Sequence, residues 1–105
     1  MNSYKIKELG WKCVDTWANR DIYSLSEKSK FSIFEHNGDW GLQDPYRKDF
    51  SLIYCNMSDD DICKFTGIVK LFDDMFDNPK AYTLYQYIET EILMQDFIKE
   101  MKQRT

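Results

Sequence analysis

The stretch Phe31-Ser-Ile-Phe-Glu-His-Asn-Gly-Asp-Trp-Gly-Leu42 decides the fold of this chain. Apolar residues alternate on both sides of Asn37-Gly38, and both of these residues accept the positive φ that a type I′ turn requires. The stretch therefore predicts a β-hairpin whose second strand ends before Pro45. Residues 50–55, Phe-Ser-Leu-Ile-Tyr-Cys, are nearly continuously apolar, which predicts a third strand in the centre of the sheet.

Upstream of the hairpin, a helix is predicted over residues 4–19. Ser3 is its predicted cap, and apolar residues recur at helical spacing at Ile6, Leu9, Cys13 and Trp17. Gly10 weakens this prediction by about 1 kcal/mol relative to alanine. Residues 21–30 are compatible with either a strand or a short helical turn.

Downstream of the third strand, two helices are predicted. Ser58 caps the first, and an amphipathic stripe follows it at Ile62, Phe65, Val69, Phe72 and Phe76. Asn78 is the predicted cap of the second helix and Pro79 its first residue. This last helix is expected to end near Lys102.

The predicted order is therefore helix, three or four antiparallel strands, helix, helix. Consecutive hairpins supply the sheet, so no parallel crossover is required. The sequence predicts an α+β fold over residues 1–105 as one globular domain. In this fold an N-terminal helix is followed by the sheet, and two C-terminal helices pack on it.

The charge of the chain is concentrated in one segment. The net charge is −4, and residues 56–79 carry all of it, with two lysines and six aspartates: Asp59, Asp60, Asp61, Asp73, Asp74 and Asp77. Two interpretations stand side by side, a solvated helix face and a docking surface for a basic partner. The aromatic content of 16% exceeds what a small core needs, which favours a contact surface.

Trp40 and Asp39 form a second predicted contact on the hairpin. The segment from Glu35 to Pro45 holds three acids and no lysine or arginine, so it could insert into a basic cleft. The alternative is that Trp40 covers the sheet edge or joins the core.

Several classes of function are disfavoured by the residues themselves. The three cysteines lack metal-binding spacing and His36 has no sequence neighbour that would make a catalytic pair, so neither a cofactor, a metal nor an enzymatic reaction is predicted. The acidic pI of about 4.9 and the scattered basic residues argue against direct nucleic-acid binding. No apolar run is long enough for a signal peptide or a membrane span, which predicts a cytoplasmic location without membrane association.

In size, acidity, aromatic content and α+β plan, the chain resembles small bacterial immunity proteins of contact-dependent and polymorphic toxin systems. The resemblance implies a non-catalytic inhibitor, a monomer or weak dimer, that neutralises a basic toxin domain, often a nuclease. In this interpretation the aspartates stand in for phosphates and aromatic residues provide a buried anchor.

Three other functions remain open from the sequence. One is a phage-encoded anti-defence inhibitor, such as an anti-CRISPR protein, whose acidic face mimics nucleic acid. Another is a domain that binds a small molecule or catalyses a reaction in a polar pocket. The last is a structural subunit that self-associates through its C-terminal helix.

Overall fold

The computed structural model describes residues 1–49 and 51–104. The elements are, in chain order, α1 (Ser3–Glu8), β1 (Lys12–Trp17), β2 (Arg20–Ser24), β3 (Ser32–His36), β4 (Asp39–Gln43), β5 (Leu52–Ile53), α2 (Asp59–Asp77), the 3-10 turn η1 (Pro79–Ala81) and α3 (Leu84–Gln103). The strands form one antiparallel sheet in the order β1-β2-β3-β4-β5. The α+β prediction is confirmed, and five strands replace the three or four that were expected.

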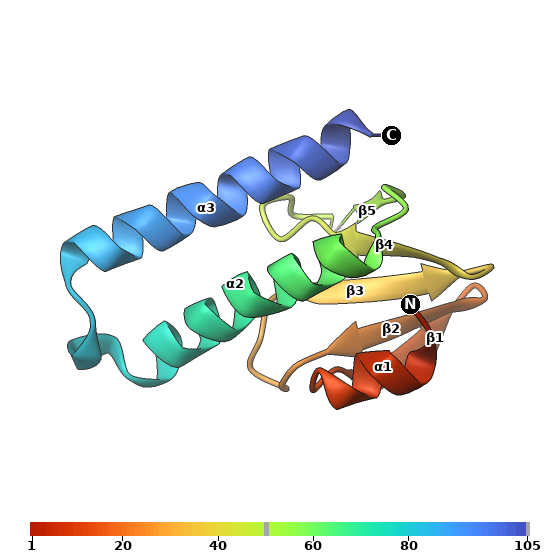
Figure 1. Ribbon diagram of the computed structural model, residues 1–105, viewed down its shortest axis with the longest axis horizontal. Coiled ribbons are helices and arrows are strands. Elements are labelled where there is room, and N and C mark those ends of the chain that lie inside the picture. Colours follow the sequence, from red (N-terminus) through yellow and green to blue (C-terminus); the bar gives the residue numbers. More distant parts are fainter. Residues whose placement is uncertain (50, 105) are drawn as a thin grey trace.

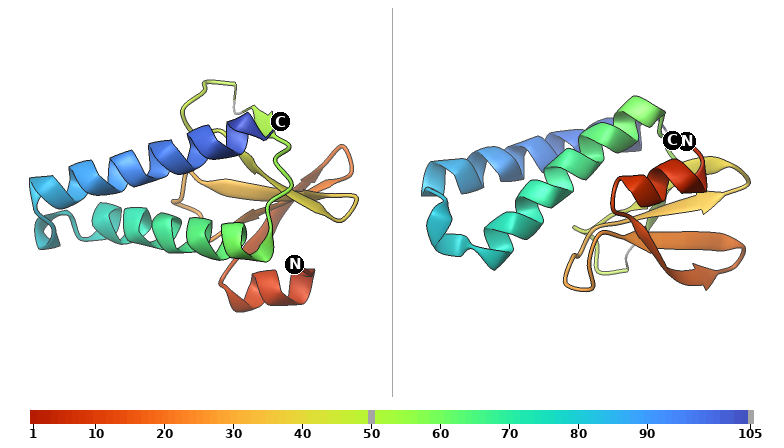
Figure 2. Two further views of the ribbon diagram at one scale, coloured as in Figure 1. Left: turned by 45° about the horizontal axis from the view of Figure 1, so that its top comes forward. Right: turned by 60° about the horizontal axis from the view of Figure 1, so that its bottom comes forward.

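The three helices cover one face of the sheet. Figures 1 and 2 show α2 and α3 over the strands, with α1 beside the beginning of α2. The strand register places alternate residues of neighbouring strands under these helices, namely Tyr23, Ile33, Leu42 and Ile53. The other face of the sheet has no helix on it among the described residues.

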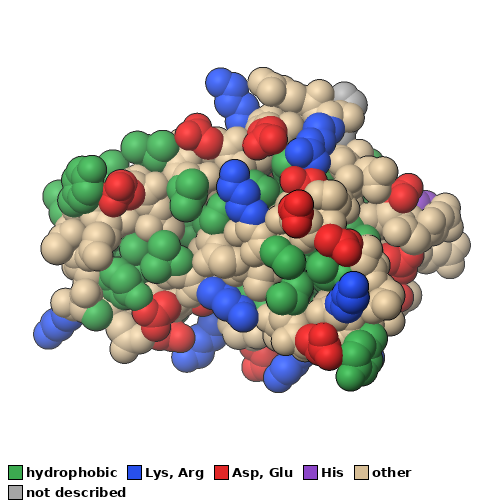
Figure 3. All heavy atoms as spheres, viewed as in Figure 1, with side chains coloured by type: hydrophobic (Ala, Val, Ile, Leu, Met, Phe, Trp, Pro, Cys, Tyr) green, Lys and Arg blue, Asp and Glu red, His purple; other side chains and the backbone are tan. Residues whose placement is uncertain are grey.

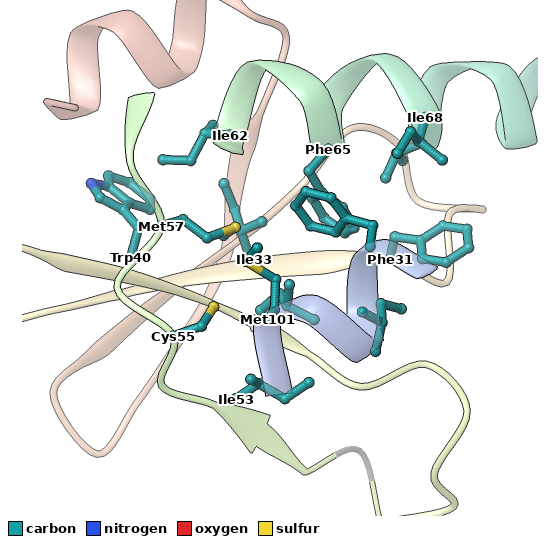
Figure 4. Packing of buried hydrophobic residues seen from close by; sticks show 14 of the residues in the cluster. Phe31, Ile33, Trp40, Ile53, Cys55, Met57, Ile62, Phe65, Ile68 and Met101 are labelled. Carbon is teal, nitrogen blue, oxygen red and sulfur yellow. The ribbon is translucent and has the colours of Figure 1, made fainter. Parts of the chain in front are cut away.

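Phe65 of α2 lies at the centre of the core beneath the helices (Figure 4). The centroid of its ring lies 6.1 Å from that of Trp11, 6.4 Å from that of Phe31 and 5.2 Å from that of Phe97. The Trp11 indole donates a hydrogen bond of 2.8 Å to the hydroxyl of Thr66, one residue further along α2. The core therefore joins the N-terminal segment, the sheet and both long helices through one aromatic side chain.

The hairpin of β3 and β4 is confirmed. Asn37 and Gly38 have φ values of 53° and 85°, which is the backbone of a type I′ turn. The β1–β2 hairpin closes in the same way at Ala18 and Asn19, with φ values of 50° and 64°. Because alanine rarely adopts positive φ, this turn was not predicted.

The predicted helix over residues 4–19 is wrong, because α1 ends at Glu8 and β1 follows it. Gly10 has a φ of 103°. Its amide donates a hydrogen bond to the Lys7 carbonyl and the Trp11 amide donates one to the Ile6 carbonyl, which together form a Schellman motif. Ile6 and Trp11 are both buried, as the hydrophobic contact of this motif requires. The segment over residues 21–30, left open by the sequence, begins with strand β2.

The third predicted strand is shorter than expected and lies at the edge of the sheet, not at its centre. Within residues 50–55, β5 covers Leu52–Ile53, and Phe50 lies outside the described residues. Cys55 and Met57 are buried in the core although they belong to an irregular segment. Between them, Asn56 bends the chain with a φ of 48°. The apolar residues after Ile53 therefore indicate burial in the core and not a longer strand.

Helix α2 begins as predicted, with Ser58 and Asp61 forming a reciprocal capping box. The boundary of the last helix differs from the prediction. Asn78 and Pro79 begin η1, and α3 is capped instead by Thr83, which forms a capping box with Gln86. The short turn at Pro79 separates the two long helices and lets α3 run back along α2.

The two long helices project beyond the sheet as a helical tip, defined here as residues 71–96. Figure 1 shows the ends of α2 and α3 joined by η1 at one end of the molecule, away from the strands. The molecule measures 41 × 27 × 27 Å as a result. No helix in the described ranges is long and apolar enough to cross a bilayer.

Candidate protein-binding site

An apolar groove of about 530 Å³ lies between α2 and α3 in the helical tip. Its apolar lining comes from both helices: Phe72, Met75, Phe76, Tyr87, Ile88 and Ile92. Phe76 is 74% exposed, and Ile88 and Ile92 are about half exposed. Hydrophobic side chains gather at this end of the molecule in Figure 3, while charged side chains of both signs are mixed over the rest of the face.

The groove exists because the sheet does not extend under the tip. The buried residues of α3 are Thr90 and residues further along the chain, ending at Met101. The apolar residues of its first half, among them Leu84 and Tyr85, are exposed. The phenol oxygen of Tyr87 lies 3.2 Å from the Met75 carbonyl and 2.9 Å from the Pro79 carbonyl, which ties α3 to the end of α2.

The helical tip is also the most acidic part of the molecule. Residues 71–96 contain one basic residue, Lys80, and six acidic residues: Asp73, Asp74, Asp77, Glu89, Glu91 and Asp96. The net charge of this segment is therefore −5, whereas the rest of the chain carries +1. Exposed apolar surface and uncompensated negative charge coincide at the tip.

The structure separates the six aspartates predicted from the sequence into two groups. They occupy the two ends of α2, and twelve residues separate Asp61 from Asp73, which corresponds to about 18 Å along a helix. Asp73, Asp74 and Asp77 belong to the helical tip. Asp59, Asp60 and Asp61 lie at the opposite end of α2.

The group at the beginning of α2 is largely occupied by contacts within the molecule. The Asp59 carboxylate lies 2.8 Å from the Met1 amino group, which lowers the pKa of Asp59. Asp61 receives hydrogen bonds of 2.5 and 3.3 Å from the Arg104 guanidinium and one of 2.9 Å from the Ser58 amide. These bonds, led by those from Arg104, hold the pKa of Asp61 below its ordinary value. Asp60 is exposed.

We expect the Asp61–Arg104 pair to stabilise the fold at neutral pH and to lose this effect in acid. Because the pKa of Asp61 is lowered on folding, its contribution is present above its ordinary pKa of 3.8 and disappears as the pH falls through the lower folded value. Urea unfolding of Arg104→Gln should therefore show a deficit in stability at pH 7 that shrinks below pH 3.8.

Lys99→Gln is the control for this measurement, because it removes an exposed cation from the same end of α3. Its effect on stability should not follow the titration of Asp61. A deficit of Arg104→Gln that stays constant down to pH 2 would contradict the role assigned to the pair.

The aspartates of the helical tip have different surroundings. Asp73 is partly buried, and this burial raises its pKa, against an opposing hydrogen bond from the Ser29 hydroxyl. Asp74 accepts hydrogen bonds from the Tyr82 hydroxyl and, at 3.1 Å, from the Asn78 side-chain amide. Asp77 is exposed. The three tip aspartates therefore lie outside the lining of the groove, whereas Glu91 is part of it.

Trp40 joins the core, which was the alternative to its role as a contact residue. It is 3% exposed, its indole donates a hydrogen bond of 2.7 Å to the Met1 carbonyl, and its ring centroid lies 5.4 Å from that of Tyr23. Asp39, at the beginning of β4, is exposed. The hairpin therefore presents this carboxylate without the tryptophan.

Sequence reasoning did not locate the groove, because the apolar stripe of α2 continues without interruption from the core into the helical tip. Phe76 continues the spacing of Phe65 and Phe72, so periodicity alone gives it the same environment. The length of the helices was the signal that could have distinguished the exposed Phe76 from the buried Phe65. Helices of 19 and 20 residues extend about 30 Å, whereas strands of five residues span about 17 Å.

The cysteines differ in exposure. Cys13 and Cys63 are exposed, whereas Cys55 is buried and its burial raises the pKa of its thiol to about 11. Within residues 1–49 and 51–104, no group of three or more histidine, cysteine, aspartate or glutamate residues is placed to hold a metal ion.

We expect two of the three thiols to react with Ellman's reagent in the native protein at pH 8. The thiolate is the reactive form, and burial of Cys55 both blocks access and keeps its thiol protonated. The third equivalent should appear only after unfolding in guanidinium. Three equivalents released at one rate from the native protein would show that Cys55 is accessible.

Comparison of the chain with protein-family models, with curated proteins and with solved structures finds no significant match.

Proposed function

We propose that this chain is a non-catalytic inhibitor of the immunity-protein kind, which binds and neutralises a basic toxin domain through its helical tip. A nuclease is the toxin class that we favour. The observation that carries the proposal is the coincidence of an exposed apolar groove with a net charge of −5 in residues 71–96. The proposal accordingly moves the binding surface from all six aspartates to the three in the tip.

The two properties of the tip have separate roles in binding. Large exposed apolar side chains such as Phe76 and Ile88 lose contact with water when a partner covers them, which supplies affinity. The surrounding carboxylates attract a partner rich in lysine and arginine and accelerate its association. A nuclease meets the electrostatic requirement, because it binds phosphate with basic residues.

The charge of the tip also argues against a second copy of the chain as the occupant of the groove. Two tips brought together would each carry a net charge of −5 with Lys80 as their one basic residue. Like charges placed face to face across an interface disfavour association. A basic partner removes this repulsion and is therefore the better complement.

The proposal is tested by capture, identification and inhibition. A tag on the C-terminus lies away from the tip, because the end of α3 is at the opposite end of the molecule (Figure 1). Protein retained from the native host's lysate at low salt is released by salt, identified, purified and assayed for nuclease activity. We expect a basic toxin domain whose activity is abolished by one equivalent of the inhibitor.

Three variants connect this inhibition with the helical tip. Phe76→Ser combined with Ile88→Ser removes two exposed anchors and should weaken binding by about tenfold or more. Asp77→Lys reverses one charge of the helical tip and should slow association, most strongly at low salt. Asp60→Lys makes the same change at the other end of α2 and is expected to leave binding unchanged.

Two results would contradict the proposal. One is an affinity that is the same at low and high salt, which would remove the electrostatic role of the carboxylates. The other is full retention of binding by the Phe76→Ser and Ile88→Ser variant. A captured protein that belongs to a host defence system, in place of a toxin, would favour the anti-defence function instead.

A further inference from the structure

The face of the sheet opposite the helices carries its own exposed aromatic cluster. The register pairs Trp17 of β1 with Arg20 of β2. Because side chains alternate along a strand, Arg20 lies on the opposite face of β2 from Tyr23, which is buried in the core. Tyr54, just after β5, joins them across the sheet. Trp17 is 59% exposed and Tyr54 is 48% exposed, so the cluster is open to a partner.

Arg20 is held rigidly between the two aromatic rings. Its guanidinium carbon lies 5.6 Å from the centroid of the Trp17 ring and 5.4 Å from that of the Tyr54 ring. Its Nε donates a hydrogen bond of 2.6 Å to the Tyr54 hydroxyl, and its Nη1 donates one of 2.6 Å to the Ala18 carbonyl. A guanidinium fixed in this way loses little conformational entropy when a ligand binds.

The charge of Arg20 has no counter-ion within the molecule. Among residues 1–49 and 51–104, no carboxylate lies within ion-pair distance of its guanidinium. An arginine has five N–H groups, and two hydrogen bonds to protein oxygens leave three of them for a ligand. A planar carboxylate is the group that such a fork binds in bidentate fashion.

The lining of the surrounding groove limits what this ligand can be. The groove has a volume of about 440 Å³, and Arg20 is the one cation that lines it, alongside the carboxylates of Asp15 and Asp49. A phosphate backbone needs several basic residues in a row, so nucleic acid is a poor match. Ile22 and Leu52 add apolar surface next to the guanidinium.

We propose that the open face of the sheet is a second protein-binding site, which takes an aspartate or glutamate side chain flanked by an apolar residue. The carboxylate meets the free N–H groups of Arg20, and the apolar neighbour packs against Trp17 and Tyr54. Tryptophan, tyrosine and arginine are the residue types that dominate binding energy in protein interfaces. Here the three occur together, exposed and already ordered.

The buried side chain of Phe34 packs beneath this site. Phe34 is 1% exposed although it belongs to the open face, and its ring lies 5.0 Å from that of Tyr54 in an edge-on arrangement. It fits there because its neighbour Gly41 has no side chain, and a Cβ at that position would come within 2.5 Å of the Phe34 ring. The packing of Phe34 beside Gly41 within the sheet therefore positions the ring of Tyr54.

This second site is independent of the helical tip. The two surfaces lie on different elements, α2 and α3 in one case and β1, β2 and β5 in the other. They also bind different groups, since the acidic tip suits a basic partner and the Arg20 guanidinium suits a carboxylate. One molecule can therefore bind two different surfaces at the same time, and the sheet-face site does not rest on the function proposed for the tip.

Peptide display against the intact protein tests this inference. A library of random twelve-residue peptides is selected on the wild type and depleted on the Arg20→Lys variant, which keeps the charge and loses the planar fork. We expect enriched peptides that contain aspartate or glutamate next to an apolar residue. Their affinity should fall by about tenfold or more on Arg20→Lys and on Trp17→Ser.

Arg104→Lys provides the matched control, because Arg104 is an arginine that pairs with Asp61 and does not line this groove. It should leave peptide affinity unchanged. The inference is overturned if no peptide survives the depletion step, if the enriched peptides are basic, or if their binding ignores Arg20. It is also overturned if a single-stranded oligonucleotide binds this face with greater Arg20 dependence than the peptides.

Discussion

Replacing Phe65 with alanine is expected to lower the free energy of unfolding by about 3–5 kcal/mol, which is a large part of the total stability of an ordinary domain. Phe65 is 0% exposed and is the ring that Trp11, Phe31 and Phe97 share. Its loss leaves a cavity that these three large side chains, which come from three different parts of the chain, cannot fill without moving the helices. Urea unfolding followed by tryptophan fluorescence measures the change.

Phe76→Ala is the matched control, because it removes the same side chain from the same helix at a position that is 74% exposed. Its effect on stability should stay within about 0.5 kcal/mol, as for most surface substitutions. Similar losses at the two positions would show that the core is not centred on Phe65.

Replacing Gly41 with alanine is expected to destabilise the protein by at least about 1–3 kcal/mol. The new Cβ would lie 2.4 Å from the Ile53 carbonyl oxygen and 2.5 Å from the ring of Phe34. The first of these atoms belongs to the backbone of β5, so the strand itself must shift. The displaced Phe34 ring should also disturb Tyr54 and weaken peptide binding at the open sheet face.

Gly67→Ala tests whether this loss comes from the lack of space at Gly41. Gly67 lies within α2 and nothing lies within 4 Å of the position that its Cβ would take. Alanine is favoured over glycine inside a helix by about 1 kcal/mol, so this substitution should stabilise the protein. Unfolding midpoints in urea that change in the same direction for both variants would contradict the geometry described for Gly41.

Local chemistry was enough to predict several elements of the fold. Asn37-Gly38 between alternating apolar residues specified a hairpin, and Ser58 followed by an apolar stripe specified α2 from its first residue. The failure near the N-terminus has a physical cause. Cys13 and Trp17 continue the helical spacing of Ile6, yet both are exposed in β1, so the periodicity was coincidental.

The candidate site was only partly predictable, since charge along the sequence does not give its distribution in space. Six aspartates lie close together in the sequence, but the length of α2 separates them into two groups. In the first group, Asp59 forms an ion pair with Met1 and Asp61 forms one with Arg104. The acidity of the tip could be predicted, but the apolar groove within it depends on how far the sheet extends beneath the helices.

The helical tip also affects how such a chain can change by mutation. Residues that maintain the fold, such as Phe65 and Met101, are buried over the sheet, whereas Phe76, Leu84 and Ile88 are exposed beyond it. Mutations at the exposed positions change the surface with little effect on packing elsewhere. Substitutions in the helical tip can therefore change the exposed surface while the buried scaffold stays the same.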